Sequence, residues 1–197
     1  MSNNVDLTVS LLFFITKRTM KKITTLFKKD LNNLSRVLPE YDPENMWVLE
    51  SGIPTRKYDG TACAVIDGKL YKRYDAKHGK KLPEGAIPCQ EPDAITGHHP
   101  HWIPVTEQDK YHNEAFIKNR FSDRTYELCG PKVQGNPENF TGHILIPHGQ
   151  DVLPLTDFSF ESIKKYLEEN NIEGIVFHNE DGRMCKIRKS DFGIKRI

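Results

Sequence analysis

Apolar positions in the first part of the chain change from helical spacing to strand-like runs. Across residues 20–38 they recur every three or four residues and stop before a proline, which predicts a helix. Residues 46–51 and 57–75 carry short apolar runs typical of strands. Within the second run, Asp67-Gly68 lies between AVI and KLYKRY and predicts a two-residue hairpin turn.

The second half of the chain begins with an irregular stretch and continues with short elements. Residues 79–108 are rich in Pro, Gly and His, and a loop of that length in a compact domain more often has a function. Because hairpins dominate and no βαβ alternation is evident, the predicted class is α+β with mostly antiparallel strands. The other expected elements are a short helix at 109–121, strands at 124–130 and 143–148, a helix capped by Ser159, and a final hairpin from EGIVF through NEDG to MCKIRK.

Length and charge place limits on the kind of protein. A chain of 197 residues can form one domain with a real core, or at most one and a half. The net charge of +1 gives no overall attraction to nucleic acid or membrane, so any basic surface is local. Residues 7–15 are apolar but too short to span a bilayer, and basic residues follow them, which argues against a secretory signal. We expect residues 1–19 to be an upstream extension or an extra strand, with the folded domain at 20–197.

The cysteines indicate a reducing compartment. Cys63, Cys89, Cys129 and Cys185 are far apart and form no CxxC pair. Buried free thiols in an intracellular, cytoplasmic protein are therefore the favoured interpretation. The stretch GHHPHW at 97–102 invites a zinc site, but no further ligand lies at typical spacing. A loop that closes over a ligand, with its tryptophan packing or stacking, is favoured instead.

Two hairpins are expected to bring charged side chains together. If the final turn has an even number of residues, Glu173, Ile175 and Phe177 share a face with Lys186 and Arg188. That face could line a cleft, or it could carry an ordinary cross-strand salt bridge. In the first hairpin, Ala64 would pair with Tyr71 and Ala62 with Arg73, which returns this arginine toward Lys57–Gly60. A routine exposed arginine is the alternative.

Such a set of residues suits phosphoryl chemistry. Cations bind phosphates, carboxylates hold a metal, and a lysine becomes a nucleophile when neighbouring cations and desolvation lower its pKa. Lys57 fits this requirement if Arg56, Arg73, Lys186 and Arg188 surround it. Attack by its neutral amine on an α-phosphate would form a lysine–nucleotide phosphoramidate and release pyrophosphate. Mg²⁺, or Mn²⁺, would be held by carboxylates and phosphate oxygens.

Short motifs make this hypothesis specific. KYDGT at 57–61 resembles motif I of the covalent nucleotidyltransferases, which include DNA ligases, RNA ligases and mRNA capping enzymes. YKRYD, YELCG, EGIVFH and MCKIRKSDF resemble motifs Ia, III, IV and V, in the family's order, between residues 71 and 192. The stretches after motif III and around GHHPHW are similar to a small ATP-dependent RNA ligase family that includes the animal 5′–3′ RNA ligase. This resemblance implies an ATP-grasp-like nucleotidyltransferase domain, with two antiparallel sheets flanking a nucleotide cleft.

The resemblance also implies a role for each matching residue. Lys57 would become adenylated, Glu173 would bind metal, and Lys186 and Arg188 would grip the α-phosphate. Glu127 would contact the nucleotide sugar or help to position metal. The implied substrates are ATP and RNA ends, with no membrane partner; the oligomeric state is open, and a monomer is compatible with the sequence. Further candidates are Asp59, Gly60 and Arg73 for the nucleotide or RNA end; Phe140, His148 and Phe177 for stacking on adenine; and Arg56 and Lys132 for phosphate.

Three other functions remain open. A capping-type guanylyltransferase uses the same lysine chemistry with GTP, and a DNA nick ligase uses it on another substrate. A non-catalytic RNA-end binding module would keep the fold without the reaction, although the intact motif residues argue against lost catalysis. Motif V ends at Phe192, so we expect no C-terminal OB-fold, which counts against the capping enzyme. Arg188 also departs from the family pattern, where many relatives have a second lysine, and it would grip phosphate as a fork.

Overall fold

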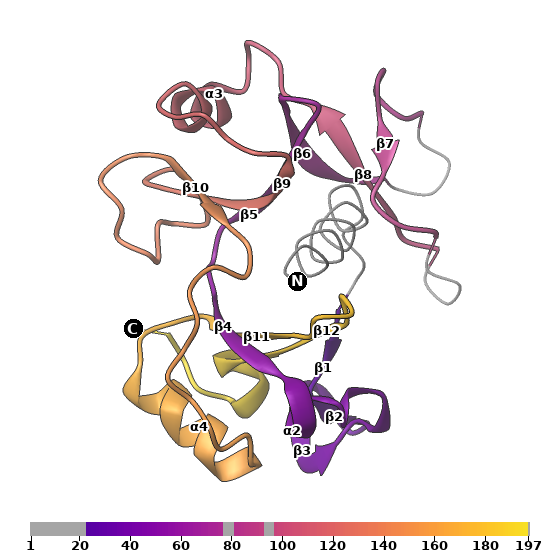
Figure 1. Ribbon diagram of the computed structural model, residues 1–197, viewed down its shortest axis with the longest axis vertical. Helices are drawn as coiled ribbons and strands as arrows, with labels where there is room; N and C mark the ends of the chain where they lie inside the picture. The colour runs from indigo at the N-terminus through magenta and orange to yellow at the C-terminus, as the bar shows by residue number, and fades with distance from the viewer. Residues whose placement is uncertain (1–22, 77–80, 93–96, 197) are drawn as a thin grey trace, which may run out of the picture. The chain divides into compact units, whose positions relative to one another are not determined.

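The computed structural model describes residues 23–76, 81–92 and 97–196 (Figure 1). These residues form two compact units. Unit 1 is Gly60–His148, and unit 2 contains the described residues before Gly60 and after His148. Each unit has its own sheet and its own hydrophobic core, so the two are described separately. The prediction for residues 1–19 lies outside the described residues.

Unit 2 is built on a four-stranded sheet in the order β1-β12-β11-β4. Strands β4 (Ile53–Lys57), β11 (Gly174–His178) and β12 (Met184–Arg188) are antiparallel neighbours, whereas β1 (Thr24–Thr25) runs parallel to β12. A separate hairpin pairs β2 (Phe27–Asp30) with β3 (Asn33–Tyr41). The remaining elements are α2 (Val48–Ser51), α4 (Phe160–Glu169) and the 3₁₀ turns η1 (Pro43–Asn45) and η2 (Lys189–Phe192).

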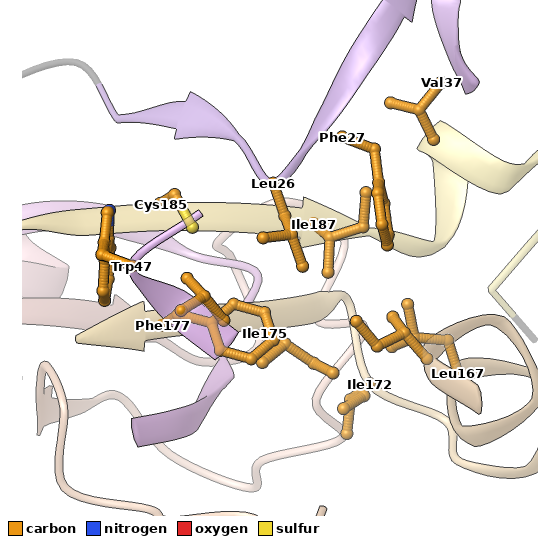
Figure 2. Packing of buried hydrophobic residues seen from close by; sticks show 12 residues of the cluster. Leu26, Phe27, Val37, Trp47, Leu167, Ile172, Ile175, Phe177, Cys185 and Ile187 are labelled. Carbon is orange, nitrogen blue, oxygen red and sulfur yellow. The ribbon is translucent and has the colours of Figure 1, made fainter. Parts of the chain in front are cut away.

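One face of this sheet forms the core of unit 2. Figure 2 shows the side chains of Ile175, Phe177, Cys185 and Ile187 gathered in one cluster with Leu26. All five are fully buried, and a buried Leu, Ile or Phe side chain contributes roughly 1.5–3 kcal/mol. Helix α4 packs against the same cluster through Ile163 and Leu167. These two residues are four positions apart and therefore lie on one face of the helix. The Ser159 hydroxyl accepts a hydrogen bond from the Ser162 N–H and caps that helix, as the sequence predicts.

Unit 1 is a six-stranded antiparallel sheet in the order β10-β9-β5-β6-β8-β7. Its strands are β5 (Thr61–Ile66), β6 (Lys69–Ala76), β7 (Ile87–Pro88), β8 (His99–Pro104), β9 (Arg124–Cys129) and β10 (Ile144–Pro147), and its helix is α3 (Lys110–Phe116). The fully buried Trp102 packs with Ala64 and Ile66, while Tyr126 and Leu128 belong to a second cluster that includes Ala115 of α3. Among all described residues, no helix is long and apolar enough to cross a membrane.

Several sequence predictions are confirmed. The fold class is α+β. The turn at Asp67-Gly68 joins β5 to β6, and both residues have positive φ angles of 50° and 72°, as the mirror-image hairpin turn requires. Ala64 pairs with Tyr71, as expected from this turn. The four cysteines are free and buried.

The helix predicted over 20–38 is wrong for every residue that the structure describes. Residues 24–41 form β1, β2 and β3 instead. The helical spacing is misleading because Leu31 and Leu34 are 87% and 67% exposed and cover no core. The Asp30 carboxylate accepts a hydrogen bond from the Asn32 N–H, which turns the chain sharply between the two strands.

Two other local predictions are also wrong. The strand predicted at 46–51 is largely the single-turn helix α2, in which the Gly52 N–H donates to the Val48 carbonyl and Trp47 and Val48 are buried. The irregular stretch predicted at 79–108 contains β8, which pairs with β6 along six residues. Three consecutive residues of β8, Pro100, His101 and Trp102, are buried, so the strand shows no alternation of apolar and polar positions that would reveal it in the sequence. Trp102 therefore packs in the core instead of closing over a ligand.

The final hairpin has a different register from the predicted one. Its turn is closed by a hydrogen bond from the Asn179 N–H to the Arg183 carbonyl, which leaves an odd number of residues in the loop. Ile175 therefore pairs with Ile187, and Phe177 pairs with Cys185. A shift of one residue turns every side chain of a strand to the other face. The predicted face that combined Ile175 and Phe177 with Lys186 and Arg188 does not exist.

Candidate active site

Lys57 ends strand β4 directly opposite Gly174, the first residue of β11. The lysine Nζ donates a hydrogen bond to the Glu173 Oε2 at 2.5 Å, and the two side chains are only 23% and 20% exposed. Gly174 allows β12 to lie close to β11, because a Cβ there would lie 2.3 Å from the Ile187 carbonyl oxygen. The structure thus brings Lys57 and Glu173 together, as predicted, although through β4 and not through the predicted hairpin face.

Strand β12 carries two cations on one face, beside the Lys57–Glu173 pair. Lys186 and Arg188 are two residues apart, so their side chains leave the strand on the same side. Burial lowers the pKa of Lys186, and the charges of Arg188 and Lys57 lower it further. The charge of Glu173 acts on both β12 cations in the opposite sense. These four residues, Lys57, Glu173, Lys186 and Arg188, are called the Lys57 cluster below.

Arg188 is held by a buried carboxylate that the sequence did not point to. Asp191, with no exposed surface, accepts hydrogen bonds from the backbone N–H, the Nε and the Nη2 of Arg188. These hydrogen bonds raise the pKa of Arg188. Lys29 also donates to Asp191, at 2.7 Å, from a position 162 residues earlier in the chain. Such a distant partner leaves no local signal in the sequence.

The residues next to Lys57 have their own partners in unit 2. The guanidinium of Arg56 lies 4.6 Å from the centre of the Tyr58 ring, and the Tyr58 hydroxyl hydrogen-bonds to Asp151. Asp59 forms an ion pair with Arg196 at 3.6 Å. Arg196 is a second partner that the motifs did not identify.

Apart from Phe177, the remaining predicted residues belong to unit 1. Ala64 of β5 pairs with Tyr71 of β6 and with Thr125 of β9. Arg73 and Glu127 each lie two residues further along their strands, so they share one face of the sheet, on either side of β5. The Arg73 Nε forms an ion pair with the Asp75 Oδ1 at 3.1 Å.

Glu127 is paired with a histidine that was predicted for another role. The His148 Nε2 lies 2.8 Å from the Glu127 Oε2. Gly60 is required where it lies, because a Cβ there would be 2.2 Å from the Leu128 carbonyl oxygen. In the loop after β9, Lys132 is exposed and Phe140 is partly buried.

Phe177 is wrong as a candidate for stacking on adenine. Its ring has no exposed surface and packs edge-on against Phe158 in the core of unit 2. For metal binding, the described residues contain no group of three or more His, Cys, Asp or Glu that could hold an ion. Mg²⁺ does not need such a group, because it commonly binds one or two carboxylates together with water and substrate phosphates. The donor set of the Lys57 cluster, with its single carboxylate, is compatible with that mode.

Comparison with known proteins gives one consistent family. A family model described as RNA ligase 1 matches residues 113–196. RNA ligase 1 of Pongo abelii is 25% identical over a region that covers 73% of this chain and 68% of the relative. RNA ligase 1 of Rattus norvegicus is 24% identical with the same coverage, and that of Danio rerio is 28% identical over 50% of this chain and 42% of the relative. The chain is therefore similar to RNA ligases, and the predicted resemblance to the RNA ligase family is confirmed.

Proposed function

We propose that this protein is an ATP-dependent RNA ligase that joins a 5′-phosphate to a 3′-hydroxyl through a lysine–AMP intermediate at Lys57, in RNA repair. The observation that carries the proposal is the Lys57 cluster, in which a partly buried lysine contacts one carboxylate and lies beside two further cations. The similarity to proteins named RNA ligase 1 supports the same reaction class.

The first step follows from the arrangement of the cluster. Glu173 accepts a hydrogen bond from the Lys57 Nζ, so it is placed to take a proton from that ammonium group. The neutral amine attacks the α-phosphorus of ATP and a P–N bond forms. The bond between that phosphorus and the oxygen bridging to the β-phosphate breaks to release pyrophosphate, and the nitrogen loses its second proton to the released pyrophosphate. Lys186 and Arg188 stabilise the negative charge that develops on the α-phosphate oxygens. Mg²⁺, held in part by Glu173 or Glu127, would neutralise phosphate charge.

Two further transfers complete the reaction. An oxygen of the RNA 5′-phosphate attacks the phosphorus of the lysine–AMP, the P–N bond breaks, and Lys57 regains a proton. The RNA 3′-hydroxyl then attacks the activated 5′-phosphate, loses its proton, and releases AMP as the phosphodiester bond forms. Arg73 and Glu127, which share a face of the unit 1 sheet, are proposed to contact the nucleotide or the RNA end.

Incubation with α-labelled ATP or GTP and Mg²⁺, followed by denaturing gel analysis, tests the first step. We expect label from ATP, stable to denaturation and released by acid, in the wild type but not in Lys57→Ala. Lys165→Ala is the matched control, because Lys165 is exposed on α4 and should label like the wild type. Label from GTP alone would replace the proposal with a capping-type guanylyltransferase. No label from either nucleotide on folded protein would refute the lysine–AMP mechanism.

A second assay tests the joining reaction. The protein, ATP and Mg²⁺ are incubated with RNA that carries a 5′-phosphate and a 3′-hydroxyl, supplied as a nicked duplex, a hairpin with a break in its loop, or a single strand. The joined product should appear with the wild type and be absent with Lys57→Ala. Joining of nicked DNA but no RNA would favour the DNA ligase alternative.

A further inference from the structure

The hairpin β2–β3 contacts the turn η2, which follows β12, through two cations. Lys29 of β2 donates to the Asp191 Oδ1, and the Arg36 Nη1 of β3 donates to the Ser190 carbonyl at 2.8 Å. Both acceptors lie in η2, the turn that follows Arg188 directly. Lys28 points elsewhere, since it pairs with Glu40 of the same hairpin at 2.8 Å. The hairpin therefore touches the Lys57 cluster through Asp191.

Asp191 fixes one edge of the Arg188 guanidinium. The Nε donates to the Oδ2 at 3.3 Å, and the Nη2 donates to the Oδ1 at 3.0 Å. A guanidinium has five N–H donors, so the Nη1 and one N–H of the Nη2 remain for an anion. The arginine side chain is 37% exposed whereas Asp191 is fully buried, so the open edge is the one that solvent or a ligand can reach.

A buried carboxylate beside Arg188 has an electrostatic cost for anion binding. Arg188 and Asp191 alone sum to zero charge, which would weaken attraction to a phosphate. Lys29 restores a net charge of +1 to the group. Its hydrogen bond uses the same Oδ1 that accepts from the Nη2, so it also fixes the carboxylate in the plane that Arg188 requires.

We propose that Asp191 and Lys29 are positioning residues for Arg188: Asp191 orients the guanidinium, and Lys29 neutralises Asp191 so that Arg188 keeps its charge for a nucleotide phosphate. This inference rests on the proposed function for the identity of the anion. It assigns the hairpin a role in nucleotide affinity, beyond packing against η2.

Binding can be measured without the chemical step by calorimetry on the full chain. The probe is an ATP analogue with a methylene group between the α- and β-phosphorus atoms, which cannot release pyrophosphate. Lys29→Met should weaken its binding by about tenfold, the size expected when one close charge is lost. Lys29→Arg should restore binding to within about twofold of the wild type, because it restores the charge beside Asp191.

Two variants separate positioning from a general effect of the hairpin. Arg36→Met removes the hydrogen bond to Ser190 but not the one from Lys29 to Asp191, and Lys28→Met removes a cation that pairs with Glu40. Both should bind the analogue within about twofold of the wild type. Equal weakening in Arg36→Met and Lys29→Met, unchanged binding in Lys29→Met, or no rescue by Lys29→Arg would each overturn the inference.

The same measurement keeps the two proposals apart. If the wild type binds the analogue but acquires no label from ATP, the lysine–AMP mechanism fails, while the Lys29 variants still decide the positioning role. If the wild type is labelled but Lys29→Met binds like the wild type, only the positioning role fails. Absence of analogue binding by the folded wild type would overturn both.

Discussion

Replacing Asp191 with Asn tests how strongly one buried carboxylate stabilises unit 2. Both of its oxygens accept hydrogen bonds: the Oδ1 from Lys29 and the Arg188 Nη2, and the Oδ2 from the backbone N–H and Nε of Arg188. An asparagine has one carbonyl oxygen and one NH₂ group. Whichever way its amide is turned, the NH₂ faces N–H donors, and two cations lose their buried anion.

The magnitude follows from the burial of the partners. Removing one member of a buried ion pair typically costs about 3–5 kcal/mol. Here Lys29 and Arg188 are 28% and 37% exposed, so water can solvate them in part after the substitution. We therefore expect Asp191→Asn to lower the free energy of unfolding at pH 7 by about 2–3 kcal/mol.

The pH dependence of this difference has a definite sign. Burial alone raises the pKa of Asp191, but the hydrogen bonds from Arg188 and Lys29 outweigh it and hold the pKa below its ordinary value. A lowered pKa in the folded state stabilises the protein above the unfolded pKa of about 3.9, and this stabilisation is lost as the pH falls through the folded pKa. The difference between wild type and variant should be constant from pH 7 to 5 and shrink by as much as about 0.7 kcal/mol at pH 3.5.

Urea unfolding followed by tryptophan fluorescence measures these free energies, with Trp47 reporting on the core of unit 2. Glu169→Gln serves as the control, since that carboxylate is 63% exposed on α4 and should change stability by less than about 0.5 kcal/mol. A loss below about 1 kcal/mol at pH 7 would show that the ion pairs of Asp191 are weak. A difference that widens in acid would contradict the assigned direction of the pKa shift.

Three further predictions concern Phe177, Phe140 and Gly174. Phe177→Ala should lower the free energy of unfolding by about 3–5 kcal/mol, because its ring is fully buried in unit 2. Phe140→Ala should leave stability within about 1 kcal/mol and weaken ATP affinity in calorimetry if this ring stacks on adenine; unchanged affinity would exclude that role. Gly174→Ala should destabilise unit 2 by about 1–3 kcal/mol in urea and abolish labelling of Lys57, since its Cβ would collide with the Ile187 carbonyl; full labelling would contradict this.

The sequence predicted those features that depend on a few adjacent residues. The turn at Asp67-Gly68 needs two positive φ angles, and the cap of α4 needs one hydroxyl, so both can be recognised locally. The β2–β3 hairpin resembles a helix in its apolar spacing, because spacing alone cannot distinguish a buried apolar residue from an exposed one. Leu31 and Leu34 contributed to the helical pattern although neither enters the core.

The site residues can likewise be divided into those that short motifs predict and those that only the folded structure brings together. Lys57, Glu173, Lys186 and Arg188 lie in short motifs, and the structure does bring these four together in unit 2. The predicted final hairpin, in which an even turn would place Glu173 on one face with Lys186 and Arg188, differs from the observed hairpin by one residue in register. The motif match does not depend on the register of the hairpin. It therefore predicts that these residues lie close together even though the predicted register is wrong.

The arginine at position 188 depends on Asp191 and Lys29, although Lys29 is far from it in the sequence. A lysine at this position would offer one ammonium group, which could serve Asp191 or a phosphate but could hardly do both with fixed geometry. The guanidinium of Arg188 binds the carboxylate with its Nε and Nη2 and keeps further N–H groups for an anion. A carboxylate that orients arginine also cancels its charge, so this arrangement needs a second cation on Asp191. Lys29 supplies that cation. If the proposed function holds, Arg188 and the lysine of the distant hairpin would therefore act as parts of one phosphate-binding arrangement.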